Sequence, residues 1–197
     1  MHKLSLKSIC LVSILMLATG GLASANLINN GGFEDGLNFW TQNPAPSGSD
    51  YGLTMDYHSD TFAARFAASG SALDALSQTF ATTIGVTYDL TFWLRNNSAA
   101  VPSNEFRVTF GGVVVQDLIN TPFLDYTPFT FSVLATSSSM TLEFAGRNGA
   151  GYFALDDISV EAGSAAGVPD TGSTALLLGA ALMGLIFFQR RFSAGAI

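Results

Sequence analysis

The sequence has very few of the residues from which most catalytic and metal sites are built. One of its 197 residues is cysteine and two are histidine. Because the single cysteine, Cys10, lies near the start of the chain, we expect no disulfide, no zinc site of cysteine ligands and no cysteine nucleophile in the mature protein. His58 is the only histidine after residue 2, which excludes a site of several histidines. We expect His58 to be an ordinary exposed residue of the polar segment 57–60.

Lysine is absent after Lys7, and charged residues make up only 12% of the chain, about half the share of an ordinary soluble domain. Residues 26–167 contain four arginines and fourteen acidic residues, a formal charge of −10. Binding to nucleic acid or to an anionic lipid surface needs a basic stripe, so neither is an expected partner of this segment. An acidic domain instead suits neutral ligands or a cation such as calcium.

Motifs that would indicate an enzyme are also missing. No Gly-x-Ser-x-Gly nucleophile elbow and no Gly-x-x-x-x-Gly-Lys phosphate loop occurs in the sequence. A glycosidase would need two facing carboxylates, but Glu105 and Glu143 alternate with apolar residues, which favours a solvated outer face. The sequence therefore predicts a non-catalytic protein, with a hydrolase as a distant alternative.

Residues 1–25 have the pattern of a secretory signal peptide. A positive start, an apolar stretch and a small-x-small cleavage site follow one another, given by Lys3 and Lys7, by Ile9–Ala18, and by Ala23 and Ala25. Cleavage after Ala25 would make Asn26 the first residue of the mature protein. The alternative is an uncleaved membrane anchor, which the short apolar stretch disfavours.

Residues 168–192 combine the features of a C-terminal sorting signal. A motif at 168–174 is followed by an apolar run at 174–188 and by Arg190 and Arg191. The arginines are expected to stay in the cytoplasm, with the preceding chain outside. At ~1.5 Å per residue the run spans only ~22 Å of a ~30 Å hydrocarbon core, so the predicted transmembrane helix is short. It is better explained as a processing signal, with a plain membrane anchor as the alternative.

Residues 26–161, between these ends, alternate apolar and polar side chains in short runs separated by Gly, Asn, Ser and Pro. This alternation predicts about ten half-buried strands, and no stretch keeps a helical period. The expected strands cover 27–29, 51–57, 62–66, 76–80, 86–94, 105–110, 113–118, 129–133, 140–144 and 152–160. Many short strands with turns between them predict an all-β domain, an antiparallel β-sandwich. Residues 162–167 are Gly, Ala and Ser, which predicts a linker.

Aromatic residues are expected to build the core of this sandwich. The chain has sixteen phenylalanines, and large rings between two sheets compensate for the absence of disulfides. Trp40 follows the segment 26–34 in an otherwise polar loop, which favours burial of its ring in the core over contact with a ligand.

The last predicted strand contains a conflict that a β-bulge resolves. Phe153 and Leu155 should face the core, and so should Ile158 and Val160, although strict alternation puts the two pairs on opposite faces. An extra residue at 156–157 removes the conflict. Two adjacent carboxylates at a bulge are costly unless they are exposed or bound to a cation, and hard oxygen ligands suit Ca²⁺. The alternative is an uncoordinated pair that faces solvent or accepts hydrogen bonds from loop amides.

The motif at 168–174 resembles the PEP-CTERM sorting signals of Gram-negative bacteria, in a Val-Pro-Asp-x-Gly-Ser-Thr form. The residues that carry the resemblance are Val168, Pro169, Asp170, Thr171, Gly172 and Ser173. The resemblance implies that a membrane protease-transpeptidase, exosortase, recognises the tail, and that the protein passes transiently through the inner membrane to the cell surface or extracellular matrix. The motif is also similar to the Leu-Pro-x-Thr-Gly signal of sortases, with Val168 in place of leucine, so a sortase-anchored wall protein is an alternative.

Residues 26–161 resemble the galactose-binding-like jelly rolls of carbohydrate-binding modules and of many PEP-CTERM ectodomains. The resemblance is carried by an opening motif at 26–34 followed by Trp40, by segments 76–80 and 88–94, and by a closing motif at 151–160. It implies a fold and a class of ligand rather than an activity. In the resembling modules a structural calcium links the opening and closing segments, which implies Glu34 and Asp157 as ligands here, with Asp156 less directly.

A sugar-binding surface is predicted around Trp93, which falls on the polar side of its strand. Arg95 shares that side, and Arg107 would join them if the next strand along the chain is adjacent in the sheet. An aromatic plate beside hydrogen-bonding side chains can hold a glycan on a sheet face. The alternative is that a loop covers Trp93.

These patterns predict a non-catalytic exported β-sandwich that exosortase sorts and that associates with extracellular polysaccharide or matrix. The expected partners are exosortase, polysaccharide and, before processing, the membrane, and the only expected cofactor is one structural Ca²⁺. The competing hypothesis is a structural or adhesive surface protein that binds no sugar.

Overall fold

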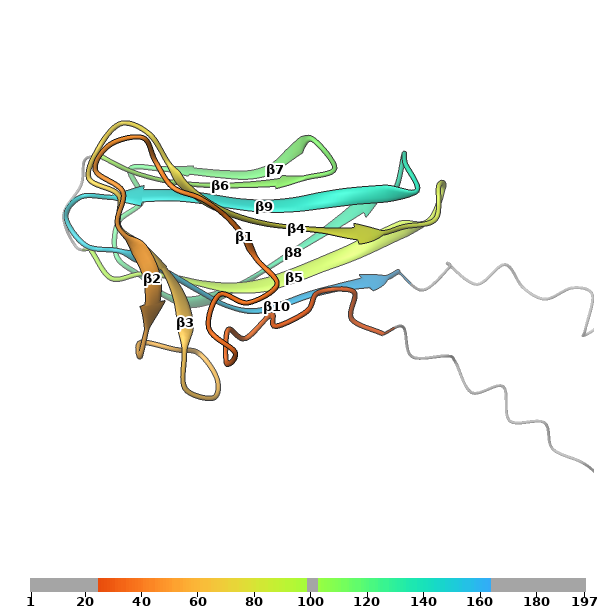
Figure 1. The fold of residues 1–197 in the computed structure, drawn as a ribbon, viewed down its shortest axis with the longest axis horizontal. Helices are drawn as coiled ribbons and strands as arrows, with labels where there is room; N and C mark the ends of the chain where they lie inside the picture. The colour runs from red at the N-terminus through yellow and green to blue at the C-terminus, as the bar shows by residue number, and fades with distance from the viewer. Residues whose placement is uncertain (1–24, 99–102, 164–197) are drawn as a thin grey trace, which may run out of the picture.

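The structure, a computed structural model, describes residues 25–98 and 103–163, which form two antiparallel sheets packed face to face (Figure 1). The described residues include no helix, and so none that is long and apolar enough to cross a membrane. The predicted signal peptide up to residue 24, with Ala23, lies outside the described residues. The sorting signal at 168–192 and most of the predicted linker also lie outside them.

The first sheet contains five strands in the order β1-β4-β9-β6-β7. Their bounds are Thr41–Asn43 for β1, Asp74–Ala81 for β4, Ser139–Asn148 for β9, Asn104–Phe110 for β6 and Val113–Ile119 for β7. The second sheet contains five strands in the order β2-β3-β10-β5-β8. Their bounds are Tyr51–Thr54 for β2, Ala63–Phe66 for β3, Phe153–Ala162 for β10, Thr87–Asn96 for β5 and Leu124–Leu134 for β8. The predicted all-β antiparallel sandwich is therefore confirmed.

The core between the sheets is built from the predicted alternation and from phenylalanine. In β5 the apolar residues at 88, 90, 92 and 94 are buried, and the polar residues between them are more exposed. Seven phenylalanines are among the largest fully buried side chains: Phe33, Phe66, Phe92, Phe106, Phe110, Phe144 and Phe153. Phe92 and Phe144, from opposite sheets, meet edge to face with ring centroids 5.1 Å apart, a favourable aromatic geometry. Trp40 is buried, as predicted, and its indole N–H donates to the Asn30 carbonyl at 3.1 Å.

One predicted strand is wrong and one strand was not predicted. Residues 27–29 form no strand; this segment makes one backbone hydrogen bond to β10, from the Leu27 N–H to the Val160 carbonyl, and the side chain of Asn26 supplies two further bonds. Its amide donates to the Ile158 carbonyl at 3.2 Å and accepts from the Val160 N–H at 2.9 Å. The strand that was missed is β1, whose three residues are polar and exposed, so it carries none of the alternation that reveals a strand.

The two ends of the sandwich differ in what they connect. At one end, which we call the tail end, the turns 82–86, 111–112 and 135–138 join strands, and β10 finishes (right in Figure 1). At the other end, which we call the far end, lie the connections 44–50, 67–73, 120–123 and 149–152. The ends of the described chain both lie toward the tail end, since the Leu27 N–H donates to the Val160 carbonyl at 2.8 Å.

Candidate functional site

The predicted calcium ligands and the predicted sugar platform meet on the outer face of the second sheet. Alternation along β5 buries Phe92 and Leu94 and turns Trp93 and Arg95 outward. Asp156 of β10 pairs across the sheet with Trp93. The loop 55–62, between β2 and β3, folds back over this pair. These three segments define the candidate site.

The predicted β-bulge in β10 is confirmed. The register of β10 against β5 shifts between Asp156 and Ser159, and Asp157 has a φ of 49°, in the left-handed region. As a result the apolar pairs on both sides of the bulge are buried in the core. The bulge also turns the Asp157 side chain toward the loop 55–62.

The three acidic residues predicted to bind calcium instead hold the loop 55–62. Oδ2 of Asp156 accepts from the N–H groups of His58 at 2.8 Å and Ser59 at 3.1 Å. Asp157 contacts the side chains of the same two residues, with the Ser59 hydroxyl at 2.6 Å and His58 Nδ1 at 2.5 Å. Oε1 of Glu34, from the opening segment, accepts from the N–H groups at 61 and 62 at 2.9 and 2.8 Å. The loop is thus attached by side chains from two distant parts of the sequence.

The burial of Asp156 has an electrostatic consequence. The residue is fully buried beneath the loop, and burial raises the pKa of its carboxyl from 3.8 to about 6. The negative charge of Asp157 raises it further, and the three N–H groups that bind the carboxylate oppose the shift. Burial also raises the pKa of the nearby Tyr126 hydroxyl above its ordinary value, and the carboxylates of Asp156 and Asp56 add to this effect.

The predicted calcium ligands do not surround a common point in the described structure. Asp156 and Asp157 do lie side by side against the opening segment, since a Cβ on Gly32 would be 3.8 and 3.9 Å from one oxygen of each. Loop residues, however, contact Oδ2 of Asp156, both oxygens of Asp157 and one oxygen of Glu34, and Oδ1 of Asp156 accepts from the N–H of Asp157 at 2.8 Å. Within residues 25–98 and 103–163, no group of three or more His, Cys, Asp or Glu side chains could hold a metal ion. As placed, these residues do not fit a calcium site, and calcium binding stays a prediction of the resemblance.

His58 lies in an exposed loop, as predicted, but its side chain has partners that the sequence did not reveal. Its ring stacks on Trp93 with centroids 3.7 Å apart and an angle of 15° between the planes. The ring also lies 5.4 Å from that of Tyr126. The loop therefore covers one face of Trp93, where a sugar ring would otherwise stack. No sequence signal could have shown this, because His58 and Asp157 are 99 positions apart.

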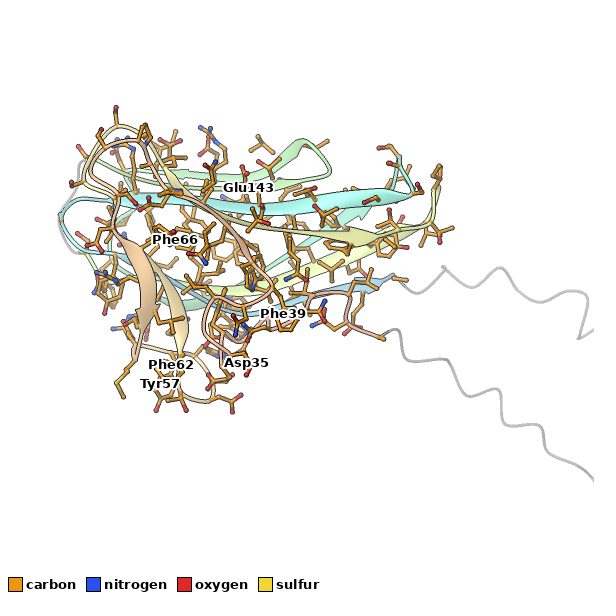
Figure 2. All side chains as sticks on the ribbon, viewed as in Figure 1. Asp35, Phe39, Tyr57, Phe62, Phe66 and Glu143 are labelled. Carbon is orange, nitrogen blue, oxygen red and sulfur yellow. The ribbon has the colours of Figure 1, made fainter. Side chains whose placement is uncertain are left out.

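An exposed aromatic patch lies beside this covered tryptophan, and its members were not predicted. Arg95 donates to Asp56 at 2.7 Å, and its guanidinium lies 5.8 Å from the ring centre of Phe123. Phe123 is 50% exposed, and Tyr57, next to Asp56 in the chain, is 45% exposed. Figure 2 shows Tyr57 at the outer edge of the molecule, below β2. We call Tyr57, Phe123, Asp56 and Arg95 the Arg95 patch; aromatic residues in polar loops are the only sequence signal for it.

Both aromatic residues of the Arg95 patch lie on loops that buried polar side chains hold. Tyr57 is in the loop 55–62, attached through Asp156, Asp157 and Glu34 as described above. Phe123 comes directly after Thr121 and Pro122 in the chain. The backbone carbonyls of these two residues accept hydrogen bonds from the side-chain amide of the fully buried Asn96, at 2.8 and 3.0 Å. The backbone around both rings is therefore held by the buried side chains of Asp156 and Asn96, and in the loop 55–62 also by the partly exposed Asp157 and the exposed Glu34.

Arg107 does not share this face, so the prediction that placed it beside Trp93 needs correction. Strand β6 follows β5 in the chain but belongs to the first sheet. Arg107 therefore lies on the opposite side of the sandwich, paired with Glu105 at 2.6 Å and Asp117 at 3.3 Å. Glu105 and Glu143 are on that outer face, as expected, and Arg147 also pairs with Glu105 at 3.4 Å. The chain crosses between sheets through the segment 97–103, where sequence alternation carries no information.

The fold is that of carbohydrate-binding-module jelly rolls. TmCBM61, solved in complex with β-1,4-galactotriose, is 17% identical over 71% of this chain and 99% of its own, with a TM-score of 0.53. The CBM22-1 xylan-binding domain from Paenibacillus barcinonensis is 13% identical over 75% of this chain and 100% of its own, with a TM-score of 0.51. The enzymatically active domain of the bacteriophage CBA120 tailspike protein 4 is 16% identical over 70% of this chain but only 21% of its own, with a TM-score of 0.53.

The C-terminal segment adds a second, independent likeness. Residues 167–192 match the VPDSG-CTERM motif, which confirms the predicted type of tail. Among curated proteins no match was found. The chain thus combines a jelly roll of the carbohydrate-binding-module kind with a C-terminal sorting motif.

Proposed function

We propose that the protein is a non-catalytic, exported domain that associates with extracellular polysaccharide through the Arg95 patch. The observation that carries the proposal is the half-exposed ring of Phe123 beside the Arg95–Asp56 ion pair, with a second half-exposed ring on Tyr57, the residue that follows Asp56 in the chain. Aromatic faces pack against the C–H groups of sugars, and charged side chains bind hydroxyls, so the two together suit a neutral glycan.

Trp93 has a supporting role in this proposal. One face of its ring is covered by His58, so a sugar could stack there only by displacing the loop. Tyr57 and Phe123 need no such displacement. The Nε of Arg95 makes no hydrogen bond with the described residues and lies 4.0 Å from Asp125, but this atom is buried, so a glycan would meet Arg95 through the exposed part of its guanidinium.

The solved structures support the class of ligand. Two of the similar folds bear names that state galactotriose or xylan binding, and both are matched over nearly their full length. The similarity to the tailspike domain covers a fifth of that chain, so it adds no support for catalysis. A neutral glycan is also compatible with a domain whose charge is strongly negative.

The direct test is affinity electrophoresis of the protein in the exopolysaccharide of its source organism and in a panel of purified glycans. Tyr57→Ala and Phe123→Ala should each weaken binding about tenfold, the usual effect of removing an aromatic contact at the centre of an interface. Phe39→Ala is the matched control, because Phe39 is an aromatic residue that is 65% exposed on a different loop. Retardation that all three variants keep would place the glycan elsewhere. Absence of retardation by every glycan would favour the competing role of a structural surface protein.

We also propose that an exosortase-like transpeptidase processes the tail on the way to the cell surface. The match at residues 167–192 supports this step, as do the apolar run and the two arginines that follow the motif. Mass spectrometry of surface-released protein should show a C-terminus near Thr171 or Gly172. If all mature material still contains Arg191, the tail is kept as an anchor and the proposed processing is wrong.

A further inference from the structure

The three turns at the tail end of the sandwich present apolar side chains and contain no charged residue. The turns 82–86, 111–112 and 135–138 contain no Asp, Glu, Lys or Arg, although the domain carries fourteen acidic residues and four arginines. Beside these turns lie four large apolar side chains that are more than half exposed: Ile84 at 66%, Val113 at 60%, Leu134 at 56% and Val114 at 53%. We call these four residues the apolar tip. Ile84 and Leu134 are on turns that hydrogen bonds join, and exposed apolar groups that lie next to each other mark a contact surface.

The two outermost residues of the apolar tip are held next to each other by backbone hydrogen bonds. The Gly85 N–H donates to the Ala135 carbonyl, and the Ala135 N–H donates to the Val86 carbonyl, both at 2.8 Å. Ile84 and Leu134, one position away from these groups, therefore project from one rigid unit. Val113 and Val114 follow the β6–β7 turn, which in Figure 1 lies nearer to the middle of the sandwich than the other two turns do.

The chain enters its C-terminal segment from this same end. The Gly163 N–H donates to the carbonyl of Thr87, the first residue of β5, at 2.8 Å. Ten residues, 164–173, separate Gly163 from the apolar run that begins at 174. Ten residues of any conformation span at most about 35 Å. While the tail is in a membrane, the tail end of the sandwich is thus the end nearest to the lipid.

We propose that the apolar tip docks on the lipid surface of the membrane while the tail is inserted, so that the sandwich stands on its tail end with the Arg95 patch directed outward. The inference rests on the proposed sorting through a membrane protease. Contact by a few apolar side chains is weak by itself, but the tail acts as a tether that raises the effective concentration of the tip at the surface.

The distribution of charge selects the kind of lipid. Acidic residues lie behind the tip in both sheets: Asp89 and Glu161 face each other across β5 and β10, and Glu143 of β9 pairs with Thr109, which pairs with Val114. Anionic headgroups repel such carboxylates within a distance of about 10 Å. The tip should therefore prefer a zwitterionic surface, and anionic lipid should weaken the contact.

The experiment uses the full chain with Cys10→Ser, inserted into phosphatidylcholine vesicles that contain a nitroxide-labelled lipid. Because no other cysteine is present, Thr83→Cys labels the tip alone and Ser71→Cys labels the far end alone with an environment-sensitive dye. We expect loss of fluorescence by lipid quenching at position 83 and none at position 71. Ile84→Ser combined with Leu134→Ser should abolish the quenching. The matched control Ile119→Ser, at a residue 59% exposed at the other end of β7, should not change it.

The alternative outcomes distinguish failure of the docking inference from failure of the proposed sorting. Equal fluorescence at positions 71 and 83, in chain that floats with the vesicles, would overturn the docking inference and leave the proposed sorting intact. Chain that fails to float would overturn both. Quenching at position 83 that survives the double serine variant, or that increases when phosphatidylglycerol is added, would show that the apolar side chains are not the contact. Protection of position 83 only when exosortase is present would identify a protein partner in place of lipid.

Discussion

At the far end of the sandwich the connections are fixed by buried polar side chains, whereas at the tail end the turns are held mainly by backbone hydrogen bonds. Two side-chain hydroxyls assist there: that of Thr82 donates to the Ser137 carbonyl at 2.7 Å, and that of Tyr88 accepts from the Thr83 N–H at 2.9 Å. The fully buried carboxylate of Asp74 accepts from the N–H groups of Ala45 at 2.9 Å and Asp50 at 3.0 Å and from the Ser49 hydroxyl at 2.5 Å. The buried amides of Asn96 and Asn148 are joined at 2.9 Å. At the tail end the side chain of Ile84 points into solvent.

The comparison shows two ways to give a loop a function. A buried polar anchor fixes a loop in one position, which suits the aromatic residues that meet a glycan, and its removal leaves unpaired donors in the interior. A short turn between long strands is held largely by its own backbone hydrogen bonds, so its exposed residues are free to serve a contact outside the molecule. Substitutions should therefore cost stability at the far end and in the loop 55–62, and cost contacts alone at the apolar tip.

The largest effect is expected at Asp74. Asp74→Ala removes three acceptor contacts and leaves the buried N–H of Ala45 and the partly buried N–H of Asp50 without partners. We expect a loss of about 3–5 kcal/mol in the free energy of unfolding, measured by urea denaturation. Asp74→Asn is the control, because its remaining oxygen still accepts one set of bonds, and it should lose about half as much. If Asp74→Ala unfolds like the wild type, the far end is not anchored in this way.

The parts of the fold that the sequence predicted are those formed by interactions between residues close together in the chain. Alternation within a strand is local, so nearly all strands and the bulge at 156–157 could be predicted. The assignment of β6 to the other sheet could not, because alternation is the same in either sheet. β1 was missed because its contacts are backbone pairs with β4 rather than a pattern of its own side chains.

The candidate site was predicted in its location but not in its chemistry. The closing Asp156 and Asp157 and the opening Glu34 do come together with Trp93. Many of their partners are backbone N–H groups of the loop 55–62. Every residue except proline has such a group, so the sequence does not reveal which ones bind. The sequence therefore left loop amides and calcium open as alternatives, and only the placement of the loop distinguishes them.

The loop 55–62 provides the next largest effect, which depends on pH. Burial raises the pKa of Asp156 from 3.8 to about 6 in the folded protein, so the folded state binds the proton more tightly than the unfolded state. Its contribution to stability is present below about pH 4 and is lost as the pH rises through about 6, a loss of about 3 kcal/mol. The measurement is the free energy of unfolding of the wild type minus that of Asp156→Asn, between about pH 4 and pH 7.

Calcium would change the sign of this result. A bound cation stabilises the ionised carboxylate, so the wild type would then gain stability relative to Asp156→Asn as the pH rises. The titration is repeated with added calcium and with a chelator. Without a calcium site the two curves coincide. A calcium-dependent gain at neutral pH would show that the loop donors yield to a metal and that the original calcium prediction is right.

A smaller effect is expected from His58. His58→Ala removes the stack on Trp93 and the contact with Asp157, whose side chain is 30% exposed like that of His58. Partly exposed contacts of this kind contribute about 1 kcal/mol. Because Trp40 is buried, increased acrylamide quenching of tryptophan fluorescence would report the uncovered Trp93. His58→Phe keeps the stack and should restore the protection; if it does not, the contact between His58 Nδ1 and Asp157 rather than the stack holds the loop over Trp93.

The smallest effect on folding is expected at the apolar tip, and it completes the contrast with Asp74. Ile84 and Leu134 are 66% and 56% exposed, so Ile84→Ser and Leu134→Ser remove little buried surface and should change the free energy of unfolding by less than about 0.5 kcal/mol each. The same urea denaturation experiment measures this. A loss as large as that of Asp74→Ala would mean that the two side chains support the core. A negligible loss together with loss of lipid quenching would separate contact from stability, because a residue that is exposed, apolar and unnecessary for folding has its effect only outside the domain.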